Sequence, residues 1–207
     1  MSRPRSRIDT RAVAAAFAPD GLHGVSAADV ARRAGIAKPT LYAHGRSKDA
    51  VFLACVEAEV ERLLNRLHAA DLPARDLGLV ARTQAIALAM IDHARAHPDA
   101  FRLLHVTARH RSSSVAAAVD GALDRVPAWI AASLRRDLPR TPSGEDPAHT
   151  LAVALHGAAV ALAINAPWRR AERERLAAVL ATALAQVAAT ESAGPREGAP
   201  AADVGIY

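Results

Sequence analysis

The chain has little of several residue types, and each shortage excludes a class of structure. Its 207 residues include one cysteine, Cys55, which excludes an intrachain disulfide and fits a reducing, cytoplasmic location. Aromatic residues make up only 3% of the sequence, although hydrophobic residues make up 51%. A core filled mainly by Ala, Leu and Val is thin, so its elements must approach one another closely. We therefore expect an all-α fold.

Motifs of common catalytic and cofactor sites are also missing. The sequence contains no Gly-rich phosphate loop, no nucleophile elbow and no spaced pair of catalytic carboxylates. His93 and His97 lie one helical turn apart, but no third metal ligand stands at a suitable spacing, and the helix dipole favours histidine near a helix C-terminus. The sequence therefore predicts no enzyme, no metal site and no cofactor.

No segment is apolar enough to span a membrane convincingly. Leu151 to Ala166 comes nearest, but His156 lies inside it and Asn165 and Pro167 stand at its end, which favours a buried helix. The Arg-rich start of the chain has no apolar stretch behind it, as a signal peptide would. We expect no membrane partner.

Charge is distributed unevenly along the chain. The formal net charge is +5, and residues 1–50 account for all of it with nine basic and four acidic residues. The other 157 residues are neutral overall, and Lys38 and Lys48 are the only lysines. A basic head on a neutral body is typical of proteins whose head binds the phosphates of nucleic acid. Residues 1–7, with Arg3, Arg5 and Arg7, form either a solvated tail or a flexible arm that contacts DNA.

Residues 24–48, GVSAADVARRAGIAKPTLYAHGRSK, contain the signals for two short helices and the start of a third. Ser26 is an N-cap, with Asp29 placed to return the bond. Gly35 supplies the positive φ of a tight exit from the first helix. Pro39 fits the first turn of the second helix, and Ser47 caps the third. The pattern predicts a helix-turn-helix, which inserts its second helix into the major groove of DNA, and the alternative is an ordinary helical hairpin.

The second helix of this pair has one face that turns inward, at Leu41, and one that faces outward. We expect base contacts from Lys38 and Thr40, with Pro39 and Ala43 beside them. Phosphate contacts are expected from four further residues: Ser26, Tyr42, His44 and Lys48.

A set of residues spread over roughly residues 7–55, about a quarter of the chain, resembles the N-terminal domain of TetR-family transcriptional regulators. The set is Phe17, Gly21, Val25, Ser26, Val30, Ala31, Ala34, Gly35, Ile36, Thr40, Leu41, Tyr42, His44, Ser47 and Lys48. The chain departs from the family pattern at Gly45, where a bracing Phe is usual, and at Asp9 and Thr10, where apolar residues are common. These departures bear on the rigidity of the head.

Apolar periodicity and turn residues divide the rest of the chain into further helices, for about nine in total. The expected helices are 47–69, followed by a connection containing Pro73; 77–97; 99–108; 115–138, with a kink or break near 123–126 caused by Pro127; 147–166; and 172–189. We expect a helix-turn-helix domain at 1–54, a helical effector-binding and dimerisation domain at 55–190, and a disordered tail at 191–207.

The last two predicted helices are apolar on nearly every side and must be covered on every side. Pairing with the same helices of a second chain covers them, and the resemblance implies such a homodimer through a four-helix bundle. Two heads then read a near-palindromic operator in double-stranded DNA. The resemblance also implies a small-molecule effector held among the middle helices, for which the candidate lining residues are Phe101, His105, Trp129 and His156.

The expected function is a ligand-responsive DNA-binding regulator, most simply a repressor that its ligand releases from the operator. The alternative is a helical dimer of the same fold that binds a small molecule or a partner but has lost operator recognition, an alternative supported by Gly45.

Overall fold

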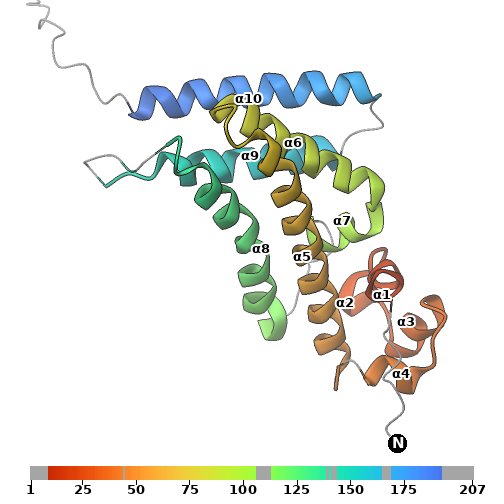
Figure 1. Cartoon of the computed structure of the whole chain (residues 1–207). Helices are drawn as coiled ribbons and strands as arrows, with labels where there is room; N and C mark the ends of the chain where they lie inside the picture. Colours follow the sequence, from red (N-terminus) through yellow and green to blue (C-terminus); the bar gives the residue numbers. More distant parts are fainter. Residues whose placement is uncertain are drawn as a thin grey trace, which may run out of the picture.

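A computed structural model describes residues 9–43, 45–105, 113–138, 140, 144–164 and 169–192. These residues form ten α-helices and no strand (Figure 1). The helices are α1 (Thr10–Phe17), α2 (Gly21–Gly24), α3 (Ala27–Arg33), α4 (Lys38–Tyr42), α5 (Lys48–Ala74), α6 (Leu79–Ala96), α7 (Pro98–His105), α8 (Ser113–Leu134), α9 (Pro147–Ile164) and α10 (Arg170–Ser192). The all-α prediction is confirmed, and the single turn of α2 is the helix that the expected count of about nine did not include.

The head consists of α1 to α4 and the first turns of α5. Its core is built around Phe17 of α1 and Phe52 of α5, which are fully buried and meet edge to face with ring centroids 5.3 Å apart. Cys55 of α5 is buried in the same core, and burial raises the pKa of its thiol to about 12. The cysteine is thus a packed, protonated thiol.

The long helix α5 joins the head to the body (Figure 1). As predicted, Ser47 caps it, accepting a hydrogen bond from the backbone amide of Ala50 at 3.1 Å. The predicted end near residue 69, with Pro73 in a connection, is wrong: α5 includes Pro73 and ends at Ala74. Asp71 and Ala74 are buried on either side of Pro73, so packing holds the last turn although one helical hydrogen bond is lost.

Helix α8 also contains a proline, Pro127, and runs through it without interruption. The proline removes the amide that would bond to the carbonyl of Leu123, which is why a kink or break was expected. A break is excluded, because Val126 and Ile130 are fully buried on either side and hold both halves of the helix in the core.

The remaining helices lie close to their predicted positions. Helix α6 begins at Leu79, after Gly78 with φ of 84°, rather than at residue 77. Helix α7 covers the first part of the predicted 99–108, of which 106–108 lie outside the described residues. Helices α9 and α10 match the predicted 147–166 and 172–189 to within a few residues. Among the described residues α9 alone is long and apolar enough for a membrane span, and 39% of it is buried inside the chain.

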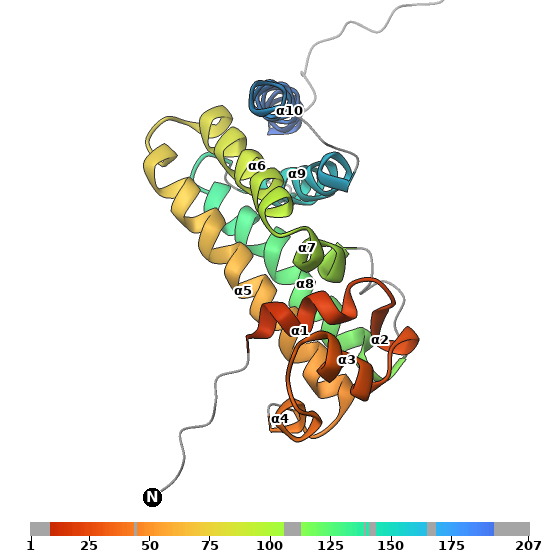
Figure 2. The same cartoon turned by 90° about the vertical axis from the view of Figure 1, so that its right-hand side faces the viewer.

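In the body, α5, α6 and α8 pack against one another, α9 packs on α6 and α8, and α10 packs on α6 and α9. Helix α10 crosses the end of the body farthest from α4 in both views (Figures 1 and 2). The predicted domain boundary at 54/55 falls inside α5, so head and body share this helix. The expected N-terminal arm (1–7) lies outside the described residues, as does nearly all of the expected tail (193–207).

Candidate nucleic-acid interface

The turn between α3 and α4 is closed by backbone hydrogen bonds. Gly35 has φ of 67°, as predicted, and its amide bonds to the carbonyl of Arg32 while the amide of Ile36 bonds to that of Ala31 at 2.9 Å. This pair of bonds is a Schellman motif, which satisfies the last carbonyls of α3 and sets the direction in which α4 leaves. The local sequence therefore determines the angle between the two helices.

Ser26 caps α3 as the sequence indicates. Its Oγ accepts a hydrogen bond from the amide of Asp29 at 3.1 Å and donates one to the carboxylate of Asp29 at 2.5 Å. Hydrogen bonds from Arg32 and Ser26 lower the pKa of Asp29 to about 2. The Ser26 hydroxyl, expected to contact phosphate, is thus engaged in the cap, although the residue is exposed.

The surface of α4 has the division of faces that the sequence predicts. Leu41 is fully buried, whereas Lys38, Pro39 and Ala43 are exposed. Thr40 and Tyr42 are half-buried. His44, the remaining candidate of this stretch, lies outside the described residues. The exposed end of α4 is therefore small and carries a single cation, Lys38.

Lys48 begins α5 and is half-buried beside the head. Its Nζ donates a hydrogen bond to the carbonyl of Val25 at 2.9 Å, which ties the start of α5 to the residue before the α3 cap. An ammonium group has three donors, so this bond leaves two for a phosphate.

Several cations of the head are already paired. Arg32 forms an ion pair with Asp29 at 2.7 Å, and Arg33 forms one with Asp20 at 2.6 Å. Within the described part of the head, Lys38 and Arg46 are the exposed cations that make neither a hydrogen bond nor an ion pair. Lys38 begins α4, and Arg46 follows the end of α4 by four residues. Arg46 was not among the predicted site residues, and its signal was its place in the basic excess of the head.

Gly45 lies where the chain passes very close to α5. A Cβ at this position would stand 2.8 Å from the amide nitrogen of Val51 and 3.0 Å from the carbonyl carbon of Ala50. Real Cβ atoms do not approach so closely, so any side chain requires a shift of backbone. Gly45 therefore permits a tight connection between α4 and α5. The aromatic rings in the core of the head are those of Phe17 and Phe52.

Polar contacts join the head to the body at α1. Arg62 of α5 donates to the Oγ1 of Thr10 at 2.9 Å and to the carboxylate of the fully buried Glu59 at 3.0 Å. Arg11 of α1 contacts the ring of His97 at 3.3 Å. Thr10, which departs from the apolar residue usual in the family, thus accepts a bond from the long helix.

Beside this junction, His93 is buried with its ring 5.2 Å from that of His97. Burial and the neighbouring His97 lower the pKa of His93 to about 4, against the opposing influence of Glu59. Among the described residues no group of three His, Cys, Asp or Glu side chains is arranged to hold a metal ion.

We expect His93 to make folding stability depend on pH. Its pKa is 6.5 in the unfolded chain and about 4 in the folded one, so below pH 6.5 the unfolded chain binds the proton more strongly. Stability should fall as the pH drops from 6.5 toward 4, by up to about 2 kcal/mol at pH 5. Urea unfolding of the wild type and of His93→Gln at pH 7 and pH 5 measures this, and an equal loss in both proteins would contradict the assignment.

The four candidate effector-pocket residues do not lie together. Phe101 and His105 of α7 have ring centroids 4.5 Å apart, and His105 lies 5.5 Å from His156 of α9. Trp129 of α8 lies elsewhere, with its ring 6.3 Å from that of His68. Three of the four thus form one group in the body and the fourth belongs to another region.

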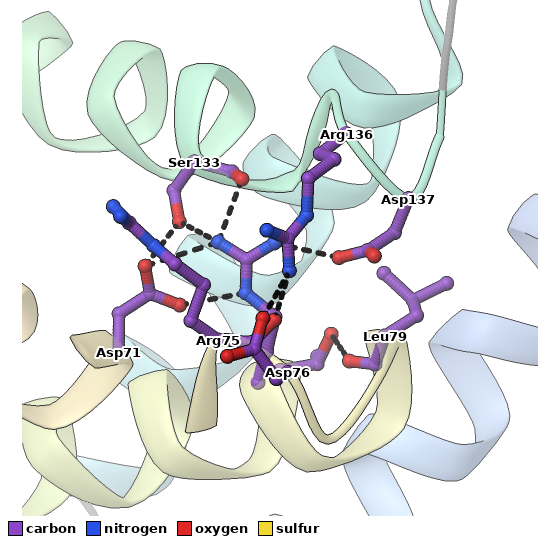
Figure 3. A network of polar contacts seen from close by, with 9 residues as sticks. Asp71, Arg75, Asp76, Leu79, Ser133, Arg136 and Asp137 are labelled. Carbon is purple, nitrogen blue, oxygen red and sulfur yellow. Dashed lines mark hydrogen bonds and ion pairs between the residues drawn. The ribbon is translucent and has the colours of Figure 1, made fainter. Parts of the chain in front are cut away.

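A buried ion-pair network links α5, α6 and α8 (Figure 3). Arg82 of α6 is 2% exposed and binds both carboxylate oxygens of Asp71, at 2.9 and 3.0 Å. It also donates to Asp137 at 2.6 Å and to the carbonyl and hydroxyl of Ser133, both at 2.7 Å. Burial raises the pKa of Asp71, but hydrogen bonds from Arg82 and Ser133 outweigh it and the net shift is downward.

The described helices thus form a helix-turn-helix head on a larger helical body. Residues 10–55 match the family model for bacterial regulatory proteins of the tetR family. The head therefore carries the sequence pattern of the TetR family, and the fold over most of the chain is similar to that of a solved TetR-family regulator.

Solved structures of such regulators match almost the full length. A tetR-family transcription regulator from Shewanella sp. PV-4 is 22% identical, with a TM-score of 0.67 over 87% of this chain and 98% of that one. One from Mesorhizobium loti is 21% identical, with a TM-score of 0.66 over 90% and 98%. FadR from Bacillus subtilis, solved in complex with stearoyl-CoA, is 11% identical, with a TM-score of 0.68 over 84% and 95%. At these identities the likeness concerns the fold.

Proposed function

We propose that the protein is a ligand-responsive regulator that binds a near-palindromic operator as a homodimer in the cytoplasm, represses transcription, and is released by a small molecule. It has no catalytic role in this proposal. The observation that carries it is the exposed outer face of α4, held by the Gly35 turn inside the segment that matches the family. Selection of bound duplexes from a random pool tests it. Failure to enrich any sequence would favour a dimer of the same fold that binds a ligand or a partner but no operator.

Within this proposal the residues of the head divide into two roles. Lys38→Ala removes an expected base contact, so it should weaken binding to the selected sequence most. Arg46→Ala and Lys48→Ala are each expected to weaken binding to all sequences and to lower the salt slope by about 1, because each removes a cation beside phosphates. Thr40→Ala should instead change sequence preference.

Fluorescence anisotropy on the selected duplex and on a random one, at several salt concentrations, measures both effects. Arg125→Ala is the control, since this exposed arginine lies on α8 of the body. Equal losses on both duplexes for Thr40→Ala would contradict its role in reading bases.

The dimer is proposed to form through α9 and α10. Val153 and Ile164 of α9 are 49% and 51% exposed, and Val179 of α10 is 59% exposed. The exposed face of α9 is otherwise composed largely of small residues, including Ala154, Gly157 and Ala161. Such a face permits close approach of a second copy, and burying it removes apolar surface from water.

Val153→Glu combined with Val179→Glu is therefore expected to give a monomer with operator affinity lowered at least tenfold, because each head then binds alone. Analytical ultracentrifugation and DNA titration measure the two effects. The matched control is Val80→Glu on α6, where a similarly exposed valine lies outside α9 and α10. A double variant that remains dimeric would place the interface elsewhere.

A structural neighbour binds stearoyl-CoA, which supports an organic effector for this fold. Phe101, His105 and His156 are the proposed effector contacts within the body, because three rings on α7 and α9 meet in its interior. An effector releases the operator only as far as it binds the released state more tightly than the DNA-bound one.

A further inference from the structure

A second region of the body has the features of a binding site. A cleft of about 400 Å³ opens between α5, α6 and α8 at the ends of these helices remote from α4. Its volume lies within the range of pockets that hold small organic molecules. The Asp71, Arg82 and Ser133 network described above contributes to its lining.

The side chains of the network bind one another, so they form part of the wall of the cleft rather than contacts for a bound molecule. Both carboxylate oxygens of Asp71 are bound by Arg82, and one also accepts the Ser133 hydroxyl at 2.8 Å. The guanidinium of Arg82 is in turn engaged with Asp71, Asp137 and Ser133. All three guanidinium nitrogens of Arg82 and both carboxylate oxygens of Asp71 are thus already engaged.

Two other arginines of the lining are exposed. Arg75 and Arg136 lie over the network in Figure 3. The side chain of Arg75 makes no hydrogen bond or ion pair among the described residues. Arg136 pairs at 3.2 Å with Asp76, whose side chain is 90% exposed, and donates to the carbonyl of Arg75. An exposed pair of this kind is weak, so Arg136 can exchange Asp76 for a ligand.

An apolar surface adjoins these donors. Trp129 is half-buried in the cleft and meets His68 edge to face, with ring centroids 6.3 Å apart. With Asp76 and Asp137 included, the charges around the cleft balance. Arg75 and Arg136 line the same cleft as the Trp129 ring, so the cleft presents two exposed guanidinium groups and an apolar surface together without a net charge.

We infer that this cleft binds a small organic carboxylate, with the carboxylate held by Arg75 and Arg136 and the apolar part of the molecule against Trp129. Guanidinium groups bind carboxylates in a planar, bidentate arrangement, which suits both arginines. The site is distinct from the Phe101, His105 and His156 group.

The cleft also has a route to the head. It contacts the last turns of α5, and the first turn of the same helix carries Lys48 beside the helix-turn-helix. A ligand that bridges α5 and α8 favours one orientation of α5. The carboxylate is then an effector, a step that rests on the proposed function.

Heavy-atom quenching of Trp129 tests the site without DNA. In a Trp168→Phe background Trp129 is the only tryptophan. Titration with 4-iodobenzoate should quench it with a saturable curve, and neutral 4-iodobenzamide should bind at least tenfold more weakly. Arg75→Gln with Arg136→Gln should weaken iodobenzoate binding at least tenfold, whereas the control Arg125→Gln on α8 should not. Calorimetry on the unsubstituted protein provides the same comparison without the tryptophan change.

Linear quenching that is the same for both probes and unaffected by the double variant would overturn the site. A DNA titration separates the two proposals. If the selected duplex is bound and saturating iodobenzoate leaves its affinity unchanged, the effector role is overturned. If no duplex is bound even without the probe, the proposed function fails while the quenching result still decides the site.

Discussion

Replacing Arg82 by leucine is expected to lower the free energy of unfolding by about 3–5 kcal/mol, which is a large share of the stability of a typical domain. The substitution leaves the carboxylate of Asp71, 3% exposed, without its two hydrogen bonds from Arg82 and with little access to water. It also releases Asp137 and Ser133, so α5, α6 and α8 lose their common tie.

Urea unfolding followed by circular dichroism measures this effect. The control is Arg136→Leu, which removes an arginine of the same region whose ion pair with Asp76 is exposed, and it should cost no more than about 1 kcal/mol. Adding Asp71→Leu to Arg82→Leu should restore part of the loss, because the stranded carboxylate is then absent. Equal costs for Arg82→Leu and Arg136→Leu would show that the buried network contributes little.

The second large effect is expected at Gly45. Introducing phenylalanine, the residue usual in the family, should destabilise the head rather than brace it. Even the Cβ of an alanine would stand 2.8 Å from the amide nitrogen of Val51. We expect Gly45→Ala to cost about 1–3 kcal/mol and Gly45→Phe to cost at least as much.

Both variants should also lose operator affinity, at least tenfold, because relief of the contact moves the end of α4 away from α5. Thermal unfolding and titration of the selected duplex measure the two effects. Gly121→Ala on α8 is the matched control, since nothing lies within 4 Å of a Cβ there. If Gly45→Phe bound DNA more tightly, the head would have room for the ring, and the natural glycine would have removed a ring that braces the head.

The elements of the head followed from local sequence because their determinants are local. Ser26, Gly35 and Ser47 cap or end helices through bonds to residues a few positions away, and each forms the predicted contact. The inward face of α4 followed from Leu41 for the same reason. Lys48 was different: its bond to the Val25 carbonyl joins residues 23 positions apart, which no local pattern predicts.

Prolines gave the clearest errors. Pro73 was expected in a connection after its helix, and Pro127 was expected to kink or break a helix, yet α5 includes Pro73 and α8 continues past Pro127 without a break. The cost of one lost hydrogen bond is visible in the sequence, whereas the burial that outweighs it depends on which helices pack there.

The sequence by itself determined the all-α class, the helix-turn-helix and the basic head, because caps, turns, apolar periodicity and charge act over a few residues. Only the tertiary structure decided that Trp129 lies apart from Phe101, His105 and His156, and that Arg82 joins Asp71 to Asp137 across three helices. It also decided that Gly45 has no room for a side chain. These properties depend on contacts between residues distant in the chain, and such contacts exist only once the helices have packed.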